Sequence, residues 1–361
     1  MMVVALTGCG SGPEFVAAPS VPASTAGSVP SAPAGSPSAG PSASAKPVSY
    51  ANPAGHASVP AEARAVDTSR PDQVIGKGTP AGCTSAAVVE AVAEGGVITF
   101  DCGPAPVTIT MTATAKVRNA NQILVLDGGG TVTLSGAGKR RILYQNTCDK
   151  AQGWTTSHCQ DQATPRLTVQ NLVFAQGDST GQTAEGGGGG AIFVRGGRLK
   201  VVNSRFVGNR CDRTGPDLGG AAIRVLSQYH GLPVYVVGST FEKGSCSNGG
   251  ALSSLGVSWT VLNSVLKDND AVGRGANPAR SGTPGGGSGG AIYNDGDAMA
   301  LTITGTLIED NRAEEGGGAV FFVSNNRTGT VTIRNSTLRR NPSAGFETRP
   351  GIFFLGAKLS R

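Results

Sequence analysis

The residues best suited to chemistry lie in two consecutive copies of a repeated motif. One copy contains Asp268-Asn-Asp270, and the next contains Glu309-Asp-Asn-Arg312. If the copies stack, Asp268 lies beside Asp310, and Asp270 lies beside Arg312. Carboxylates could then hold Ca²⁺, which prefers oxygen ligands, while an arginine abstracts the proton next to a uronate carboxylate. One interpretation of this pattern is a calcium-assisted polysaccharide lyase, with catalytic residues Asp268, Asp310 and Arg312 and metal ligands Asp268, Asp270 and Asp310.

The same cluster also has a purely structural interpretation. Asp270 and Arg312 would form an exposed ion pair, and the other carboxylates would face water. Asn294-Asp-Gly-Asp297 is similar to part of a calcium loop but lacks the terminal Glu of the twelve-residue loop, so we interpret it as a turn between strands. Glycoside hydrolysis needs two carboxyl groups at a set separation, and the sequence identifies no such pair.

Four further residues are candidates for ligand binding. Arg274 and Arg280 lie in the longest loop of the repeat, 271–288, and loops inserted at one point of a repeat emerge on one face. These arginines would bind an anionic glycan. Tyr229 and Trp154 could stack on sugar rings, although single aromatic residues in loops are also routine.

A repeated motif must position these residues. Its form is apolar-x-Val/Ile-x-Asn/Gly-Ser/Thr-x-Phe/Leu/Ile-x-x-Asn/Gly, and its copies begin at Leu167, Leu199, Val234, Trp259, Leu301 and Val331. Positions five and eleven are Asn or Gly in every copy. These residues tolerate a left-handed backbone best, so we expect a sharp bend at both positions. The segments between the bends have the length of strands, not of helices.

A Gly-Gly-Ala marker precedes the later copies and supplies a third strand. The markers begin at Gly189, Gly219, Gly249, Gly289 and Gly317. Three strands and three bends per repeat of about 25 to 42 residues predict an all-β fold, a single-stranded parallel β-helix with three strands per coil. Position eight, always Phe, Leu or Ile, should stack inward as the core. One short helix at 84–94, capped by Thr84 and ended by Gly95-Gly96, should cover the N-terminal end.

Six of the seven cysteines are expected to form disulfides. Two pairs bracket local segments, and the third occupies one position in successive copies, where neighbouring strands about 4.8 Å apart suit a disulfide. The pairs are Cys83–Cys102, Cys148–Cys159 and Cys211–Cys246. Reduced, packed cysteines are the alternative for the third pair. Three disulfides imply an oxidising compartment.

The N-terminal residues have the pattern of an exported, anchored protein. Leu6-Thr-Gly-Cys9 resembles a bacterial lipobox, so we interpret residues 1–9 as a truncated lipoprotein signal with lipid attached to Cys9. Residues 10–66, rich in Pro, Ala, Ser and Gly, should form a disordered tether, and residues 67–361 the folded domain. The lipid would be the only membrane contact. The net charge of +6 is modest and no nucleic-acid-binding motif is present, so we expect no nucleic-acid partner.

Two segments carry a resemblance to known families. The helix followed by Gly95-Gly-Val-Ile-Thr-Phe100 and Leu126-Asp-Gly-Gly-Gly-Thr-Val-Thr-Leu134 resembles the entry to pectate-lyase-like right-handed β-helices. Gly189–Ile192 with Phe206–Asn209 is similar to the repeat of polymorphic outer-membrane proteins and related adhesins. The resemblance implies the fold but spans both enzymes and adhesins. We expect a lipoprotein on the bacterial cell surface that binds a polysaccharide or cell-surface glycan rather than an enzyme. The alternative is a polyuronate lyase, with calcium as cofactor, or a glycoside hydrolase.

Overall fold

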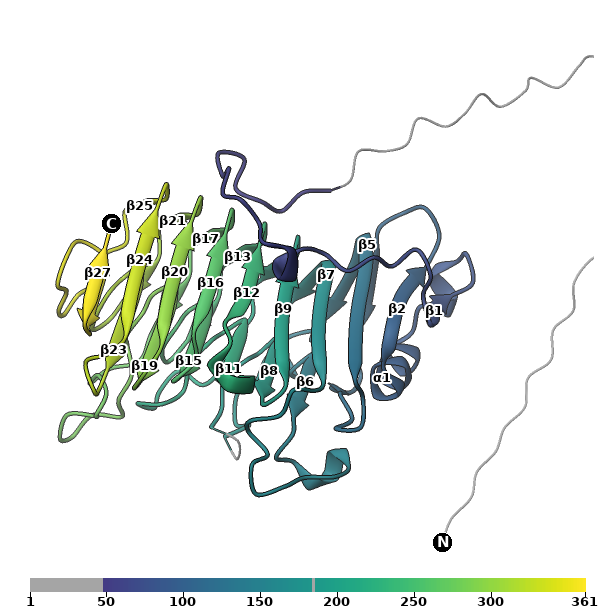
Figure 1. The fold of residues 1–361 in the computed structure, drawn as a ribbon, viewed down its shortest axis with the longest axis horizontal. Helices are drawn as coiled ribbons and strands as arrows, with labels where there is room; N and C mark the ends of the chain where they lie inside the picture. The colour runs from purple at the N-terminus through teal and green to yellow at the C-terminus, as the bar shows by residue number, and fades with distance from the viewer. Residues whose placement is uncertain (1–47, 184–185) are drawn as a thin grey trace, which may run out of the picture. The chain divides into compact units, whose positions relative to one another are not determined.

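The structure is a computed structural model that describes residues 48–183 and 186–361. These residues belong to one compact unit. The expected lipobox with Cys9 and the expected tether up to residue 47 lie outside the described residues. Parallel strands stack along one axis in the described part of the chain, and this confirms the predicted parallel β-helix (Figure 1).

Each regular coil contributes three strands, and every strand pairs in parallel with its equivalents in the neighbouring coils. The first strands are β5 (Ile123–Ser135), β7 (Arg166–Ala175), β9 (Arg198–Val202), β12 (Val234–Val237), β16 (Trp259–Leu262), β20 (Ala300–Thr304), β24 (Thr330–Arg334) and β27 (Lys358–Ser360). The second strands, which β5 and β7 include beyond their bend, are β10 (Arg205–Val207), β13 (Thr240–Glu242), β17 (Val265–Lys267), β21 (Leu307–Glu309) and β25 (Thr337–Arg339). The third strands are β4 (Ala115–Lys116), β6 (Leu143–Asn146), β8 (Ile192–Arg195), β11 (Ile223–Ser227), β15 (Leu252–Leu255), β19 (Ile292–Gly296), β23 (Val320–Ser324) and β26 (Ile352–Leu355).

The remaining elements are short. A small third sheet contains β14 (Ser245–Cys246), β18 (Asp270–Ala271) and β22 (Arg312–Ala313). The N-terminal coils use β1 (Gln73–Gly76), β2 (Gly96–Asp101) and β3 (Val107–Thr110). Single 3-10 turns occur at η1 (Ala61–Ala63), η2 (Pro80–Gly82), η3 (Lys150–Gln152) and η4 (Tyr229–Gly231).

Among the described residues there is one α-helix, α1 (Ser85–Glu94), and it packs on the first coils as expected. The Thr84 hydroxyl accepts a hydrogen bond from the Ala87 amide at 3.2 Å, and Gly95 ends the helix with a φ of 85°. Val88 and Val92 are fully buried and join the main core. Strand β2 follows directly, so the helix covers apolar side chains that an open first coil would expose.

The predicted inward column is the core of the solenoid. Phe174, Phe206 and Phe241 occupy equivalent positions on stacked strands and are at most 1% exposed. Their ring centroids lie 5.0 and 4.6 Å apart in parallel stacks. Leu266 and Ile308 extend the column fully buried, so one apolar position per coil builds a continuous core.

Left-handed backbone occurs at position five, as predicted, but not at position eleven. Asn203 and Asn263 of the former column have φ values of 42° and 51°. The second left-handed residue of each coil is instead at position ten, for example Asp268 (φ 55°) and Asp310 (φ 57°). The position-eleven Asn side chains are buried and bond along the axis: Asn269 Nδ2 donates to Asn311 Oδ1 at 2.8 Å. The second bend was therefore predicted one residue too late. Asn at position eleven does not form the bend, because its side-chain amide instead forms hydrogen bonds between coils.

The Gly-Gly-Ala column needs a similar correction of one residue. Strand pairing aligns Ile192 with Ile223, and this aligns Gly189 with Gly220 rather than with Gly219. Gly189 and Gly220 have φ values of 64° and 73°, and a Cβ at Gly220 would lie 2.1 Å from the Ile223 carbonyl oxygen. The bend before each third strand thus requires glycine at this position.

All three expected cysteine pairs are bonded. The Cα atoms lie 5.8 Å apart in Cys83–Cys102, 4.9 Å in Cys148–Cys159 and 4.8 Å in Cys211–Cys246. The third pair joins adjacent coils, and the sulfurs share a small buried cluster with Ala221. The stacking that the repeat predicts therefore brings these two residues together.

Residues 48–66, the last part of the expected disordered tether, lie ordered across the first and second strands; we call them the strap (Figure 1). Its backbone bonds the position-five bends: Asn203 Oδ1 accepts from Tyr50 N at 2.9 Å, and Asn263 Oδ1 accepts from Ala57 N at 2.7 Å. Ala63 is fully buried in an apolar cluster with Val202, Val237 and Leu262. Small side chains permit this close approach of the strap to the strands. A composition rich in small residues predicts disorder, so the sequence did not predict that the strap is ordered.

Candidate functional site

The two acidic motif copies stack as predicted, but their side chains do not converge. Pairing aligns Asp270 with Arg312, and the neighbouring register brings Asp268 next to Asp310. Arg340 binds the carboxylate of Asp310 through Nε at 2.6 Å and Nη2 at 2.7 Å. The Arg312 guanidinium contacts Glu314 at 2.7 Å instead of Asp270. Two of the three expected catalytic side chains therefore already form ion pairs.

The pKa values of these carboxyls follow their surroundings. The hydrogen bond from Arg340 holds the pKa of Asp310 below its usual value. Burial raises the pKa of Asp270, Arg312 opposes this effect, and Glu314 and Asp268 add to it. Within residues 48–183 and 186–361, no group of three or more His, Cys, Asp or Glu side chains is placed to hold a metal ion. Asp268, Asp270 and Asp310 thus lack the convergence that a calcium site requires.

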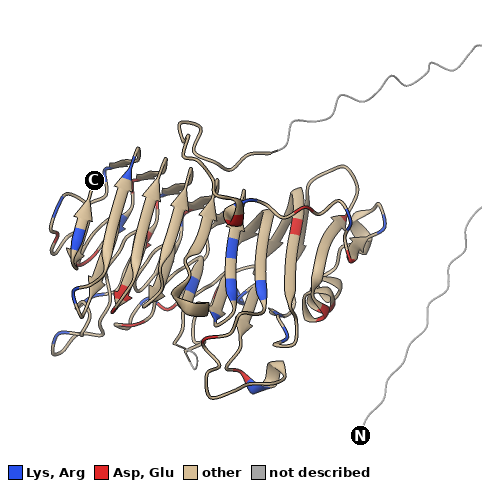
Figure 2. Ribbon diagram, viewed as in Figure 1, with Lys and Arg blue, Asp and Glu red and all other residues tan. Residues whose placement is uncertain are grey.

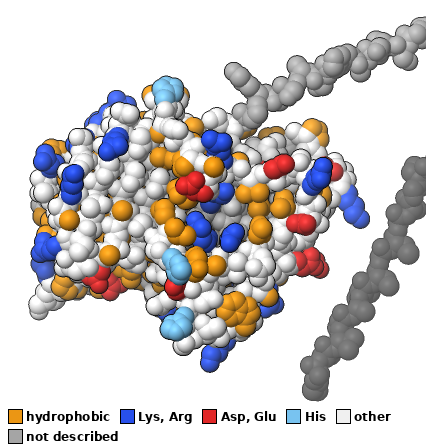
Figure 3. Space-filling model, in the orientation of Figure 1, with side chains coloured by type: hydrophobic (Ala, Val, Ile, Leu, Met, Phe, Trp, Pro, Cys, Tyr) orange, Lys and Arg blue, Asp and Glu red, His pale blue; other side chains and the backbone are white. Residues whose placement is uncertain are grey.

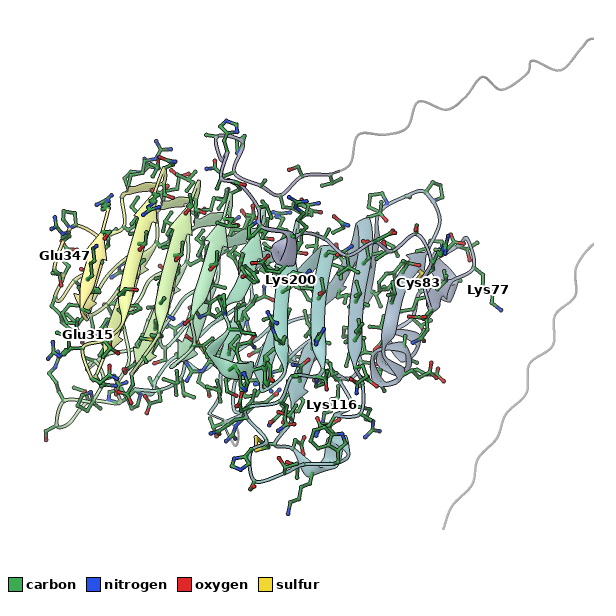
Figure 4. All side chains as sticks on the ribbon, viewed as in Figure 1. Lys77, Cys83, Lys116, Lys200, Glu315 and Glu347 are labelled. Carbon is green, nitrogen blue, oxygen red and sulfur yellow. A yellow bond between two sulfur atoms is a disulfide. The ribbon has the colours of Figure 1, made fainter. Side chains whose placement is uncertain are left out.

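The long loop holds one of its two expected arginines in a structural role. Arg280 binds the buried Glu315 with two hydrogen bonds, of 2.9 and 2.7 Å, and this pair anchors the loop to the next coil. Arg274 is exposed, and its backbone pairs with Gly285 across the loop. Figure 4 labels Glu315 at the end of the molecule that carries the last coils, far along the axis from Lys200.

The two aromatic candidates lie on separate loops. Tyr229 stacks on His230 at 3.9 Å, and the His230 amide donates to Asp161 at 2.7 Å. Trp154 is 42% exposed, beyond η3. Trp259, the first residue of its motif copy, is buried and donates from its indole nitrogen to Ser254 Oγ at 3.0 Å. A sugar could reach the Trp154 ring, whereas His230 covers one face of Tyr229.

An acidic pocket that the sequence did not predict lies where the third strands end. Its volume is about 550 Å³, and Asp217, Asp295 and Asp297 line it together with Asn325. Asn277 Nδ2, from the long loop, donates to both Asp217 Oδ1 and Asp295 Oδ2 at 2.9 Å. These two carboxylate oxygens are therefore at most twice that distance apart. The turn expected at 294–297 is in fact the end of β19 and one wall of this pocket.

Burial and neighbouring groups shift the pKa values of residues in and behind the pocket. Burial raises the pKa of Asp295, and the charge of Asp217 raises it further, against hydrogen bonds from Tyr293 and Asn325. Burial also lowers the pKa of the fully buried Arg224 to about 10, so this guanidinium keeps its charge at neutral pH. The result is one carboxyl group with a raised pKa next to a second, exposed carboxyl group.

A basic groove crosses the outer face of the first strands. Its volume is about 290 Å³; Arg166, Arg198 and Lys200 supply its charges, and Glu62 and Val66 of the strap form one wall. Figure 2 shows these cations on β7 and β9, whereas β16 and β20 of the same sheet are uncharged in this view. Figure 3 shows basic side chains in a hollow at the centre of this face, between hydrophobic side chains.

The groove holds its cations without carboxylate partners. Lys200 Nζ donates to the carbonyl oxygens of Arg64 at 2.7 Å and Glu62 at 3.3 Å, beside η1 (Figure 4). Burial lowers the pKa of Lys200, and the nearby Arg198 lowers it further. In the part of the chain that the structure describes, neither Arg166 nor Arg198 has a side-chain ion pair or hydrogen bond.

The sequence contains a signal for this groove in the residues that flank the first apolar position of the motif. Arg166 and Arg198 both stand one residue before the first apolar position of their motif copies, and Lys200 stands one residue after it. Alternation along a strand directs all three outward. The strap, which closes the groove, has no comparable signal.

Comparisons with known proteins give no relative: no protein-family model, no curated protein and no solved structure matches this chain. None of the described helices is both long and apolar enough to cross a membrane. The basic groove and the acidic pocket are therefore the two features that bear on function.

Proposed function

We propose that this protein is an exported, lipid-anchored β-helix that binds a glycan at the bacterial cell surface. The observation that supports this most is the basic groove: a solvent-open channel with unpaired cations, a half-buried tyrosine at Tyr235 and exposed apolar surface at Ile123. Sugar-binding sites combine such flat apolar contacts with a few polar groups that fix orientation. The three disulfides favour an oxidising location outside the cytoplasm.

Glycan binding is tested by applying the full chain, with its disulfides intact, to an array of neutral, acidic and sulfated glycans. We expect retention of at least one class without release of reducing ends. An array on which no glycan class is retained would contradict the proposal. Protein reduced with dithiothreitol serves as a control for folding, because Cys211–Cys246 joins adjacent coils and the other two disulfides close local loops.

Lipid attachment is a separate part of the proposal. Replacing Cys9→Ser removes the only thiol in the lipobox, so the variant should no longer incorporate labelled fatty acid and should leave the membrane fraction. Equal incorporation by the variant and the original chain would contradict a lipid anchor at this residue.

A second candidate function is glycoside hydrolysis in the acidic pocket. The supporting observation is the pair Asp217 and Asp295, joined through one Asn277 amide, with the pKa of Asp295 raised. Asp295 would act as the general acid and Asp217 as the nucleophile or base. Asp295→Asn should abolish release of reducing ends, while Asp101→Asn, an exposed residue at the end of β2 and outside the pocket, should retain it. Hydrolysis that survives Asp295→Asn would exclude this pair.

A further inference from the structure

We propose that the ligand of the basic groove is an acidic polysaccharide that carries one carboxylate per sugar and lies across the strands, along the axis of the solenoid. This inference rests on the proposed glycan-binding function and names the class of glycan. The geometry that supports it is the alignment of two arginines on consecutive coils.

The outward side chains of the groove form two rows across neighbouring strands. The first row is Ile123, Arg166 and Arg198, which are direct register partners. The second row, two residues further along each strand, is Val125, Thr168, Lys200 and Tyr235. Neighbouring strands are about 4.8 Å apart, close to the length of one pyranose unit in an extended chain. A chain along the axis therefore passes one strand for each sugar.

The positive charges of the groove repel one another in the folded protein. Arg166 and Arg198 are directly paired across two parallel strands, and like charges in this arrangement destabilise a sheet. Lys200 adds a third cation two residues from Arg198. The single acidic residue lining the groove, Glu62, accepts a hydrogen bond from Tyr235 at 3.1 Å instead of pairing with a cation. An anion bound over the row would remove this repulsion.

The type of cation and its spacing favour a uronate. Arginine presents a planar set of donors that bonds a carboxylate through two parallel hydrogen bonds. The row provides one arginine on each of two consecutive coils, and this spacing matches one carboxylate per sugar rather than the denser charge of a sulfated chain or a polyphosphate. Ile123 is 48% exposed, and Tyr235 is half-buried at the far side, so apolar ring faces have surfaces to contact at both ends.

The strap makes this site a groove instead of a flat sheet face. Glu62 and Val66 line it, and Lys200 binds two strap carbonyl oxygens. The Val66 backbone is held in turn by Gln170, which donates to Val66 O at 3.0 Å and accepts from Val66 N at 2.9 Å. The wall is thus fixed to β7, the strand that also carries Arg166.

The test uses the full chain with intact disulfides and measures affinity by calorimetry. The probe is an oligogalacturonate, and the comparison is the same oligomer with its carboxylates methyl-esterified. We expect the ester to bind at least tenfold more weakly, and Arg166→Gln and Arg198→Gln each to weaken the acid about tenfold, with a reduced salt dependence. Arg339→Gln, a cation outside the groove that is paired with Glu309, is the matched control and should change affinity less than twofold.

Each alternative result contradicts a different statement. Equal affinity for the acid and the ester would overturn the uronate inference and leave the glycan-binding function intact. Tight binding of a sulfated oligosaccharide or of polyphosphate, with none of the oligogalacturonate, would also overturn it. Retention of no glycan at all on the array described above would instead contradict the proposed function itself. Loss of affinity in Arg339→Gln equal to that in Arg198→Gln would show that net charge, not the groove, is recognised.

Discussion

Two rows of charged side chains cross this solenoid, and their patterns are opposite. On the second strands, the outward row reads Glu242, Lys267, Glu309 and Arg339, so that charge alternates in sign from coil to coil. On the first strands, the basic groove has Arg166 directly beside Arg198. We call the alternating row the charged rim. Alternation satisfies each charge within the protein, whereas repetition of one sign leaves charge available for a ligand.

The contacts of the two rows agree with this difference. Glu242, which is 6% exposed, bonds Arg205 Nε at 2.6 Å and lies 3.2 Å from Lys267 Nζ. Glu309 contacts Arg339 at 2.7 Å. The groove arginines have no such partners among the described residues. The rim therefore has a structural role, and the groove is the better candidate for function, even though the rim includes the more acidic motif copies.

The apolar column, rather than either charged row, is expected to hold the coils together. Phe206→Ala should lower the free energy of unfolding by about 3–5 kcal/mol, since it opens a cavity between two stacked rings. Chemical denaturation with intact disulfides measures the change. Phe206→Leu, which keeps most of the volume, should cost about 1 kcal/mol. A rim or groove variant that destabilises the protein as much as Phe206→Ala would contradict this ranking.

The largest effect of charge is expected at the buried end of the rim. Glu242→Gln should lower the free energy of unfolding by about 1–2 kcal/mol at pH 7, because it removes charged hydrogen bonds. Burial alone would raise the pKa of Glu242, but Arg205 and Lys267 outweigh it and hold the pKa below its usual value. The ionised form therefore stabilises the fold above the unfolded-state pKa, and this contribution disappears as the pH falls through the lower folded-state pKa.

Denaturation at a series of pH values tests this sign. The difference between Glu242→Gln and the original chain should be constant near neutral pH and should shrink below about pH 4. If this difference in free energy of unfolding grew on acidification, Glu242 would be protonated in the folded protein. The charges of the rim would then not alternate at this position.

A smaller loss is expected at the exposed end of the rim. Arg339→Gln breaks a contact with Glu309 in which the arginine side chain is 54% exposed, so the free energy of unfolding should fall by no more than about 0.5 kcal/mol. The change should vanish in 1 M salt, because salt screens exposed pairs. Thermal unfolding at low and high salt measures both values, and a salt-independent loss would point to packing by the arginine stem instead.

The smallest effect has the opposite sign. Arg198→Gln should leave stability unchanged or raise it by a few tenths of a kcal/mol at low salt, because it removes the repulsion between Arg198 and Arg166. The same measurement therefore separates the two rows: loss in the rim and gain in the groove. A destabilisation by Arg198→Gln that exceeds the loss in Arg339→Gln would show that Arg198 is a structural residue.

The sequence predicted those parts of the fold that repeat. Apolar and Asn/Gly columns recur in every copy, so their consequences, such as stacked Phe206 and the pairing of Cys211 with Cys246, follow from the period alone. The error at position eleven has a local cause, since Asn suits both a left-handed bend and a buried amide ladder, and only coordinates separate the two. Register within the Gly-Gly-Ala marker was ambiguous for the same kind of reason.

Parts that do not repeat were predicted less well. The strap closes the groove through small residues and backbone bonds, such as Ala57 N to Asn263 Oδ1, and these leave no periodic pattern. The acidic pocket depends on Asn277, a loop residue that reaches both Asp217 and Asp295. Long loops obey no period, so the sequence could not show which carboxylates they bring together.

The central claim is that the unpaired cations of the groove bind a carboxylate-bearing glycan. Its most direct test is the stability of the folded chain, at low salt, with and without an oligogalacturonate at one hundred times its Kd. The original chain should gain about 2.7 kcal/mol in free energy of unfolding. The double variant Arg166→Gln/Arg198→Gln, whose Kd should be about a hundredfold higher, should gain only about 0.4 kcal/mol at the same concentration while unfolding normally on its own. An equal gain in the double variant would contradict the claim.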